Sequence, residues 1–143
     1  MKFISSTYDK EKGYAIVEVQ HLGYRFIGDA HAHPEDKANW SEFAGCSYAE
    51  TRAMIKALTY ERTLAKNKAD QAIDFVKSCE CYAGFDKDSP TAKAMYRQMN
   101  QRIKRVNDLA DEINGLYDYL NKCIKRREIV LNAIDRKKSK EDN

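Results

Sequence analysis

The sequence contains few of the residues that interrupt regular structure, with 2 prolines and 6 glycines among its 143 residues. A chain of this length corresponds to one domain, and no proline- or glycine-rich stretch separates it into parts. No apolar run approaches the length of a membrane span. The start, MKFISSTYDKEKG, has no uninterrupted apolar segment of the kind found in signal peptides. We therefore expect a single domain, residues 1–143, located in the cytoplasm without a membrane partner.

Sequence signatures of catalysis are also missing. There is no P-loop, no GxGxxG, no nucleophile beside a base and no convincing pair of catalytic carboxylates. We expect no enzymatic activity, no catalytic residue and no cofactor. Thiols stay reduced in the cytosol, and a CxC pair on a helix points in two directions. Cys46, Cys79, Cys81 and Cys123 are therefore interpreted as structural thiols.

Two histidines form the nearest approach to a metal site. His31 and His33 are followed directly by Glu35 and Asp36, which can ligate zinc. A zinc site needs three or four ligands at regular spacing, and no second ligand motif is present. The sequence therefore favours the other interpretation, in which His31 ends a strand and Pro34 begins the turn to a helix. We predict no metal site.

The first third of the chain predicts strands. KFISSTY, YAIVEVQ and YRFIGDAH are rich in β-branched and aromatic residues and are separated by DKEKG and HLG. They predict a three-stranded antiparallel meander over 1–33, followed by a connecting turn over 34–44. Ala15, Val17 and Val19 share one face of the second strand, and that face needs a cover.

From about Ser41 the apolar spacing becomes helical. Ser89 before Pro90 is typical of an N-cap followed by proline at the first helical position. The predicted segments are a first helix over 45–82, a loop over 83–89, a second helix over 90–137 and a tail over 138–143. The fold class is therefore α+β, with a small N-terminal three-stranded antiparallel sheet followed by a long two-helix antiparallel hairpin.

The second predicted helix has two apolar columns. Heptad a and d positions run from Tyr96 to Ile134, and Leu109, Leu116, Cys123 and Val130 form a further column at g. This apolar face is wider than one partner helix needs, which indicates an oligomer, and we expect a dimer built on the hairpins. Arg127 occupies a core position, where it would either fix the register of packing or pair with an acid across the interface.

Charge is distributed unevenly along the chain. Residues 1–90 carry 12 basic and 14 acidic side chains, whereas 91–143 carry 13 basic and 8 acidic ones. The segment SPTAKAMYRQMNQRIKRVN, residues 89–107, has no acid although it begins a helix, where acids are favoured. Free N–H groups with arginines suit phosphate, and nearby aromatic rings suit a base. This pattern indicates a nucleotide site made of Phe75, Tyr82, Phe85, Arg97, Arg102 and Arg105. A solvated basic face explains the same residues equally well.

A second basic and aromatic group links the third strand with the first helix. Arg25 lies between Tyr24 and Phe26, and Arg52 and Lys56 lie one turn apart. These cations could form a second anion site if the helix covers the sheet. Ordinary surface charge is the favoured alternative, because single surface charges are common.

One stretch resembles a known family. The pattern runs from an F-x-G-x-A strand through a P-E-D turn into a G-C-x-x-A-x-x-R-A helix. It is matched by Phe26, Gly28, Ala30, Pro34, Glu35, Asp36, Gly45, Cys46, Ala49, Arg52 and Ala53. With a small sheet and a long helical hairpin at this length, the chain resembles the phage Thoeris anti-defence protein one family.

The resemblance implies a function that composition does not. Such proteins sequester cyclic ADP-ribose isomers made by bacterial Thoeris systems, without cleaving them, in the cytoplasm of the infected host. Some members also hold cyclic trinucleotides of CBASS, a second defence system, in separate sites, and they assemble as dimers and hexamers. The residues alone leave two further functions open: a nucleic-acid-binding module using the basic helix, and a structural adaptor that docks through the hairpin.

Overall fold

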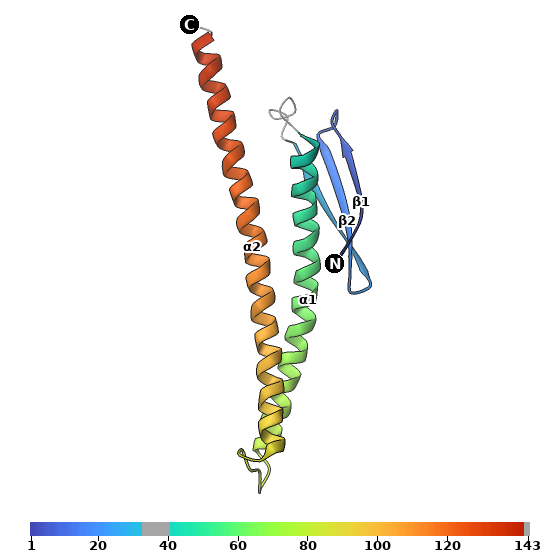
Figure 1. Cartoon of the computed structure of the whole chain (residues 1–143), viewed down its shortest axis with the longest axis vertical. Coiled ribbons are helices and arrows are strands. Elements are labelled where there is room, and N and C mark those ends of the chain that lie inside the picture. The colour runs from blue at the N-terminus through green and yellow to red at the C-terminus, as the bar shows by residue number, and fades with distance from the viewer. Residues whose placement is uncertain (33–40, 142–143) are drawn as a thin grey trace.

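The computed structural model describes residues 1–32 and 41–141, without the side chains of 127–131 and 134, and has the predicted α+β fold. The elements are β1 (Lys2–Asp9), β2 (Tyr14–His21), β3 (Tyr24–His31), α1 (Glu42–Glu80) and α2 (Pro90–Glu141). In Figure 1, α1 lies between the sheet and α2, and α2 continues past the beginning of α1. Helix geometry makes α1 about 58 Å and α2 about 78 Å long. Within the described residues, no helix combines the length and apolarity that crossing a membrane requires.

The sheet is the predicted antiparallel meander, in the order β1-β2-β3. Its second hairpin is closed by Leu22 and Gly23, whose φ angles of 53° and 80° are both positive. Two positive φ angles are typical of the tight turn that matches strand twist. The predicted alternation on β2 is confirmed, because Ala15, Val17 and Val19 are all buried.

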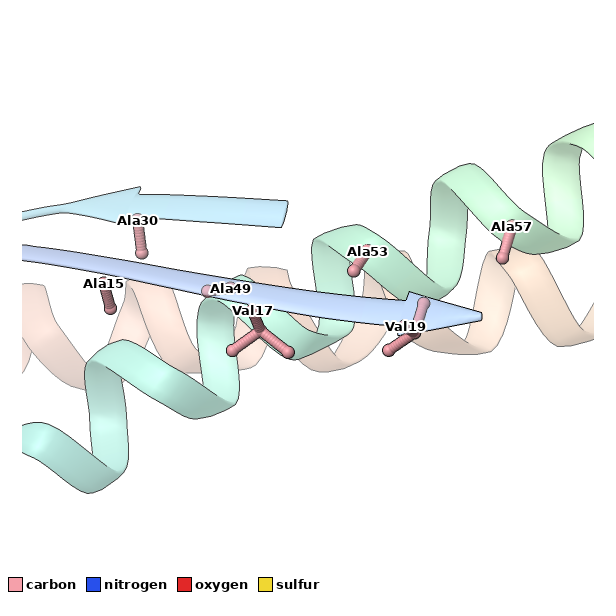
Figure 2. Packing of buried hydrophobic residues seen from close by; sticks show 7 residues of the cluster. All are labelled: Ala15, Val17, Val19, Ala30, Ala49, Ala53 and Ala57. Atoms are coloured by element: carbon pink, nitrogen blue, oxygen red, sulfur yellow. The ribbon is translucent and has the colours of Figure 1, made fainter. Parts of the chain in front are cut away.

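Small residues bring α1 unusually close to the sheet. Ala49, Ala53 and Ala57 lie at four-residue spacing on α1 and pack with the buried face of β2, as Figure 2 shows. A Cβ atom added to Gly28 would lie 1.9 Å from the Ala49 carbonyl oxygen and 2.4 Å from the Ala53 nitrogen. Glycine at 28 therefore lets the helix backbone rest directly on β3.

Capping explains where α1 differs from its predicted bounds. The helix begins at Glu42 rather than 45, because the Ser41 side chain accepts a hydrogen bond from the Ala44 N–H at 3.1 Å. Most of the predicted turn over 34–44, including Pro34, Glu35 and Asp36, lies outside the described residues, as does His33. The helix ends at Glu80 rather than 82.

The end of α1 corrects the prediction that both residues of the CxC pair lie on a helix. Cys79 is in the last turn, but Cys81 is the C-cap, and its N–H bonds to the Cys79 carbonyl oxygen. Across the loop, α2 begins at Pro90 as predicted, and the Ser89 hydroxyl accepts from the Ala92 N–H. It extends to Glu141, past the predicted end at 137, with Lys138 and Lys140 favourably placed at the negative end of the helix dipole.

The helix hairpin packs through a different side of α2 than the a and d positions alone predict. Ile55 and Leu58 of α1 contact a buried group on α2 made of Leu109, Ile113 and Leu120, with Leu116 beside it. These α2 residues occupy d and g positions. The a-position residues Tyr117 and Ile124 are 50% and 40% exposed. The a side of α2 therefore keeps apolar surface that α1 does not cover.

Candidate functional site

The loop that joins the two helices carries two of the predicted aromatic residues. The Phe85 ring is half-buried and packs edge-on against Tyr96 of α2, with ring centroids 6.5 Å apart. Tyr82 is 77% exposed, and Phe75, on the last turns of α1, is 61% exposed. Phe85 is therefore the predicted aromatic residue that the fold fixes next to the start of α2.

One side of α2 forms a shallow depression next to this loop. It has a volume of about 440 Å³ and is lined by Lys93, Tyr96, Arg97, Asn100, Gln101 and Lys104, which we call the basic depression. Residues at these spacings lie on one face of a helix. The lining contains no acidic side chain, although Lys104 also contacts Asp108 at 2.9 Å. All six residues come from α2, so the depression has a single wall.

A second depression shares Tyr96 with the first. It measures about 410 Å³ and is lined by Glu80, Phe85, Asp86, Lys87, Asp88 and Tyr96, which we call the acidic depression. Burial raises the pKa of the Tyr96 phenol, and its contact with the Glu80 carboxylate raises this pKa further. The phenol is therefore neutral at physiological pH and can donate a hydrogen bond. The basic depression and the acidic depression thus share the Tyr96 side chain.

The two remaining predicted arginines face α1 instead. A residue advances by roughly 100° around a helix, which turns Arg102 roughly 140° and Arg105 roughly 80° away from Arg97. Arg102 Nη1 donates to the Lys68 carbonyl oxygen at 3.3 Å, and Arg105 pairs with the Glu61 carboxylate. The structure therefore places Phe85 against Tyr96 and Arg97 in the basic depression that Tyr96 also lines, and it places Arg102 and Arg105 between the helices.

Arg105 belongs to an ionic group that connects three elements. Glu61 of α1 contacts Arg105 of α2 through one carboxylate oxygen and His21 of β2 through the other, the latter at 2.6 Å. Burial alone would raise the pKa of Glu61, but hydrogen bonds from His21 and Arg105 outweigh it and lower this pKa. The group therefore holds an ionised carboxylate at the junction of sheet and hairpin.

Sequence reasoning missed His21 and Glu61. Glu61 lies between Leu58 and Ala65 in the apolar spacing of α1, so its helical position could have identified it as facing inward. His21 carries no such signal, because it ends a strand 40 residues away from its partner. Such a distant contact is visible only in the folded chain.

The second predicted anion group is held by the sheet. Arg52 Nη1 donates to the Asp29 carbonyl oxygen at 3.0 Å, and Lys56 Nζ donates to that of Ile27 at 2.7 Å. Arg25 pairs with Glu18 on the neighbouring strand at 3.4 Å. All three cations thus use at least one donor within the protein.

An aromatic group continues this column along α1. Tyr60 lies one turn beyond Lys56, and its ring centroid is 5.2 Å from that of Tyr24 and 5.7 Å from that of Phe26. Tyr24 is 59% exposed, so the outer part of the group is open to solvent. Cations and aromatic rings therefore lie in sequence along the outer edge of β3.

The histidine that the structure describes near the predicted turn has local partners. His31 contacts the Asp29 carboxylate at 3.2 Å, and its ring centroid lies 4.4 Å from that of Tyr14. Across residues 1–32 and 41–141, no group of three or more metal-ligating side chains is found. Burial also raises the pKa of the Cys46 thiol, with Glu42 adding to the effect, which favours the unreactive protonated form.

The family-like pattern corresponds to a packing contact. Phe26, Gly28 and Ala30 lie on β3, while Ala49, Arg52 and Ala53 lie on the part of α1 that covers it. The spacing of these residues is thus explained by strand–helix packing. Comparison of the chain with protein-family models, with curated proteins and with solved structures finds no match.

Proposed function

We propose that this protein binds and sequesters cyclic nucleotide messengers, above all isomers of cyclic ADP-ribose, without cleaving them. In this proposal it is a phage anti-defence protein acting in the cytoplasm of the infected bacterium. The observation that carries the proposal is the meeting of a basic and an acidic depression at Tyr96. Cyclic ADP-ribose carries a charged diphosphate and ribose hydroxyl groups. A surface with basic and acidic parts can bind both.

The basic depression suits the diphosphate. Lys93, Arg97 and Lys104 line it without any acidic residue, and Asn100 adds an amide. Charge-assisted hydrogen bonds to phosphate oxygens are among the stronger polar contacts in proteins. The first turn of α2 has no acid, so no carboxylate of the helix itself opposes a phosphate bound beside Lys93.

The acidic depression suits the ribose and the base. Glu80, Asp86 and Asp88 can accept hydrogen bonds from ribose hydroxyls or an adenine amino group. The rings of Phe85 and Tyr96 offer a surface for stacking.

A second copy of the chain would complete the site. The basic depression has one wall, and a ligand held there tightly needs another. Tyr117 and Ile124 leave apolar surface on the a side of α2, which fits a dimer built on the hairpins and, as the family resemblance implies, a hexamer. In such an assembly the facing α2 would close over the ligand.

A separate site for cyclic trinucleotides is proposed along β3. Arg52 and Lys56 supply cations there, and Tyr60 and Tyr24 supply rings. Arg25 pairs with Glu18 on the sheet face that points away from α1, so it lies apart from them. Each cation has donors beyond the one used within the protein, since guanidinium has five N–H groups and ammonium three. Sequestration at either site acts by mass action, which requires nanomolar affinity, about −12 kcal/mol.

Thermal unfolding with and without cyclic ADP-ribose isomers tests the proposal. Ligand at about 100 times its Kd stabilises the folded state by about 2.7 kcal/mol, which raises the Tm. Arg97→Glu should abolish this shift, while Arg62→Glu, a matched reversal on the exposed side of α1, should retain it. Loss of the shift in Arg102→Glu instead of Arg97→Glu would move the site to the α1 side.

The fate of the bound ligand separates the competing functions. After heat denaturation, a sequestering protein releases intact ligand, whereas a linear product would reveal an enzyme. No shift with any cyclic nucleotide, together with steeply salt-dependent binding to DNA or RNA, would favour the nucleic-acid-binding module. No binding to either would favour the structural adaptor.

A further inference from the structure

The two edges of the sheet are treated differently by the rest of the protein. On the outer edge of β3, Arg52 and Lys56 donate to the carbonyl oxygens of Asp29 and Ile27. These side chains occupy acceptors that a further strand would need. The outer edge of β1 has no partner strand among the described residues, and Figure 1 shows β1 on the side of the sheet away from α1.

The composition of β1 does not protect this edge. Its sequence is KFISSTYD, so six uncharged residues lie between Lys2 and Asp9. Natural edge strands are protected from pairing with another chain by a charge, a proline or a β-bulge. Between its ends β1 has no charge or proline, and its one irregularity lies at Ile4, near the start of the strand. Phe3, at 52% exposed, adds apolar surface. The composition of β1 is therefore typical of a strand that pairs with other strands on both of its edges.

Opposite charges stand at the two ends of β1 on the same face of the sheet. Lys2 pairs with Gln20 and Asp9 pairs with Tyr14, and both of these β2 positions face away from α1. In a regular strand, residues seven apart would face opposite sides. Here an irregularity between Phe3 and Ser5 inserts one residue, Ile4, which brings the two ends onto one face.

The same inserted residue brings two aromatic rings into phase. Phe3 pairs with Val19 and Tyr8 pairs with Ala15, both on the buried face of β2. In an antiparallel pair of β1 strands, each matched position therefore receives a complementary residue: lysine faces aspartate, and phenylalanine faces tyrosine. Between the ends, Ser5 and Thr7 share the outer face, and Ser6 lies at the centre.

We propose that β1 pairs antiparallel with β1 of a second copy of this chain, across a two-fold axis at Ser6. The two three-stranded sheets would then form one continuous sheet. In this register Lys2 faces Asp9 of the partner subunit, and Phe3 faces Tyr8 of the partner subunit. Ser5 faces Thr7 of the partner subunit, and Ile4 is the unpaired bulge residue in each strand.

Charge complementarity selects a second copy as the occupant. A twofold-symmetric contact uses the same patch on both subunits, so the patch must complement itself. Lys2 and Asp9 meet this requirement at both ends of the contact. This interface is separate from the proposed hairpin contact and does not depend on nucleotide binding.

Charge exchange tests the register. The dimer dissociation constant is measured by analytical ultracentrifugation at low salt for Lys2→Glu, for Asp9→Lys and for the double variant. Each single change places like charges opposite one another twice per dimer, which should weaken association about fivefold to thirtyfold. The double variant restores both ion pairs and should return to within about threefold of the original. Equal constants for all four proteins, or no recovery in the double variant, would overturn the proposal.

Cysteine cross-linking tests the axis independently of other interfaces. In a chain with Cys46, Cys79, Cys81 and Cys123 replaced by serine, Ser6→Cys should form a disulfide-linked dimer under mild oxidation, because directly paired residues lie within disulfide range. Ser5→Cys is the matched control, since it faces position 7 of the partner subunit and should cross-link much less. Absence of a Ser6→Cys dimer, or equal yields for both variants, would exclude this pairing and leave the edge to a strand from another protein.

Discussion

Replacing Gly28 with alanine tests how closely α1 rests on the sheet. The added Cβ would lie 1.9 Å from the Ala49 carbonyl oxygen, and contacts under 3.0 Å essentially never occur. Helix and strand would therefore have to separate by about 1 Å at this point, the difference between these two distances. Overpacking of this kind costs about 3 kcal/mol, since neither clashing backbone atom can rotate away.

The movement would also affect neighbouring contacts. Arg52 and Lys56 bond the carbonyl oxygens of Asp29 and Ile27, on either side of Gly28 along β3. Ala49→Gly should not rescue the variant, because the clash involves the Ala49 carbonyl oxygen, which glycine also has. This failure of rescue distinguishes backbone contact from ordinary side-chain crowding.

Urea unfolding followed by circular dichroism measures the effect. Gly115→Ala is the matched control, because a Cβ added there, within α2, meets nothing within 4 Å. It should stabilise the protein by about 0.5–1 kcal/mol through helix propensity. Glycine to alanine should thus lower the free energy of unfolding at position 28 and raise it at position 115. A Gly28→Ala protein as stable as the original would refute the close approach of α1 to β3.

Three further predictions concern single contacts. The pKa of Glu61 is lowered in the folded protein, so its ionised carboxylate stabilises the fold at pH values above the ordinary pKa of 4.5. This stabilisation is lost as the pH falls through the folded pKa. Glu61→Gln should therefore lose less stability than the original protein between about pH 5 and pH 3, in acid titrations followed by circular dichroism. Ser89→Ala removes the cap that accepts from the Ala92 N–H, and should cost about 1 kcal/mol in urea unfolding, whereas Ser89→Asp should retain most of it. Lys56→Met keeps the length of the side chain but removes the donor to the exposed Ile27 carbonyl oxygen, which water can then solvate. It should cost about 0.5–1 kcal/mol, and a melting curve equal to that of the original protein would contradict the role of Lys56 at this edge.

Much of the fold follows from local patterns in the sequence. Alternation on β2 identifies its buried face, and the serine–proline pair at 89–90 marks the start of α2. These features depend only on residues that are close in the sequence, so they can be predicted from the sequence alone. The inward position of Glu61 could also have been found, because it lies in the apolar spacing of α1 between Leu58 and Ala65.

The parts that sequence reasoning did not place depend on helical phase. α2 has apolar columns at a, d and g, and the sequence alone does not say which two face α1. The structure turns d and g inward, which exposes Tyr117 and directs Arg105 to Glu61. Arg97, on another side of the same helix, thereby separates from the two arginines grouped with it in the sequence. A rotation of α2 about its axis thus decides which cations share a surface.

The packing of α1 on two sides at once has a consequence for how the chain can change in length. Between Ala49 and Leu58, α1 contacts both β3 and α2, so one inserted residue would rotate all later contacts by roughly 100°. The loop over 81–89 lies beyond these contacts, where added or deleted residues leave both the alanine-lined and the leucine-lined surfaces in phase. Insertions and deletions should therefore accumulate there, which would let related chains reshape the surface around Tyr96 while the rest of the fold stays constant.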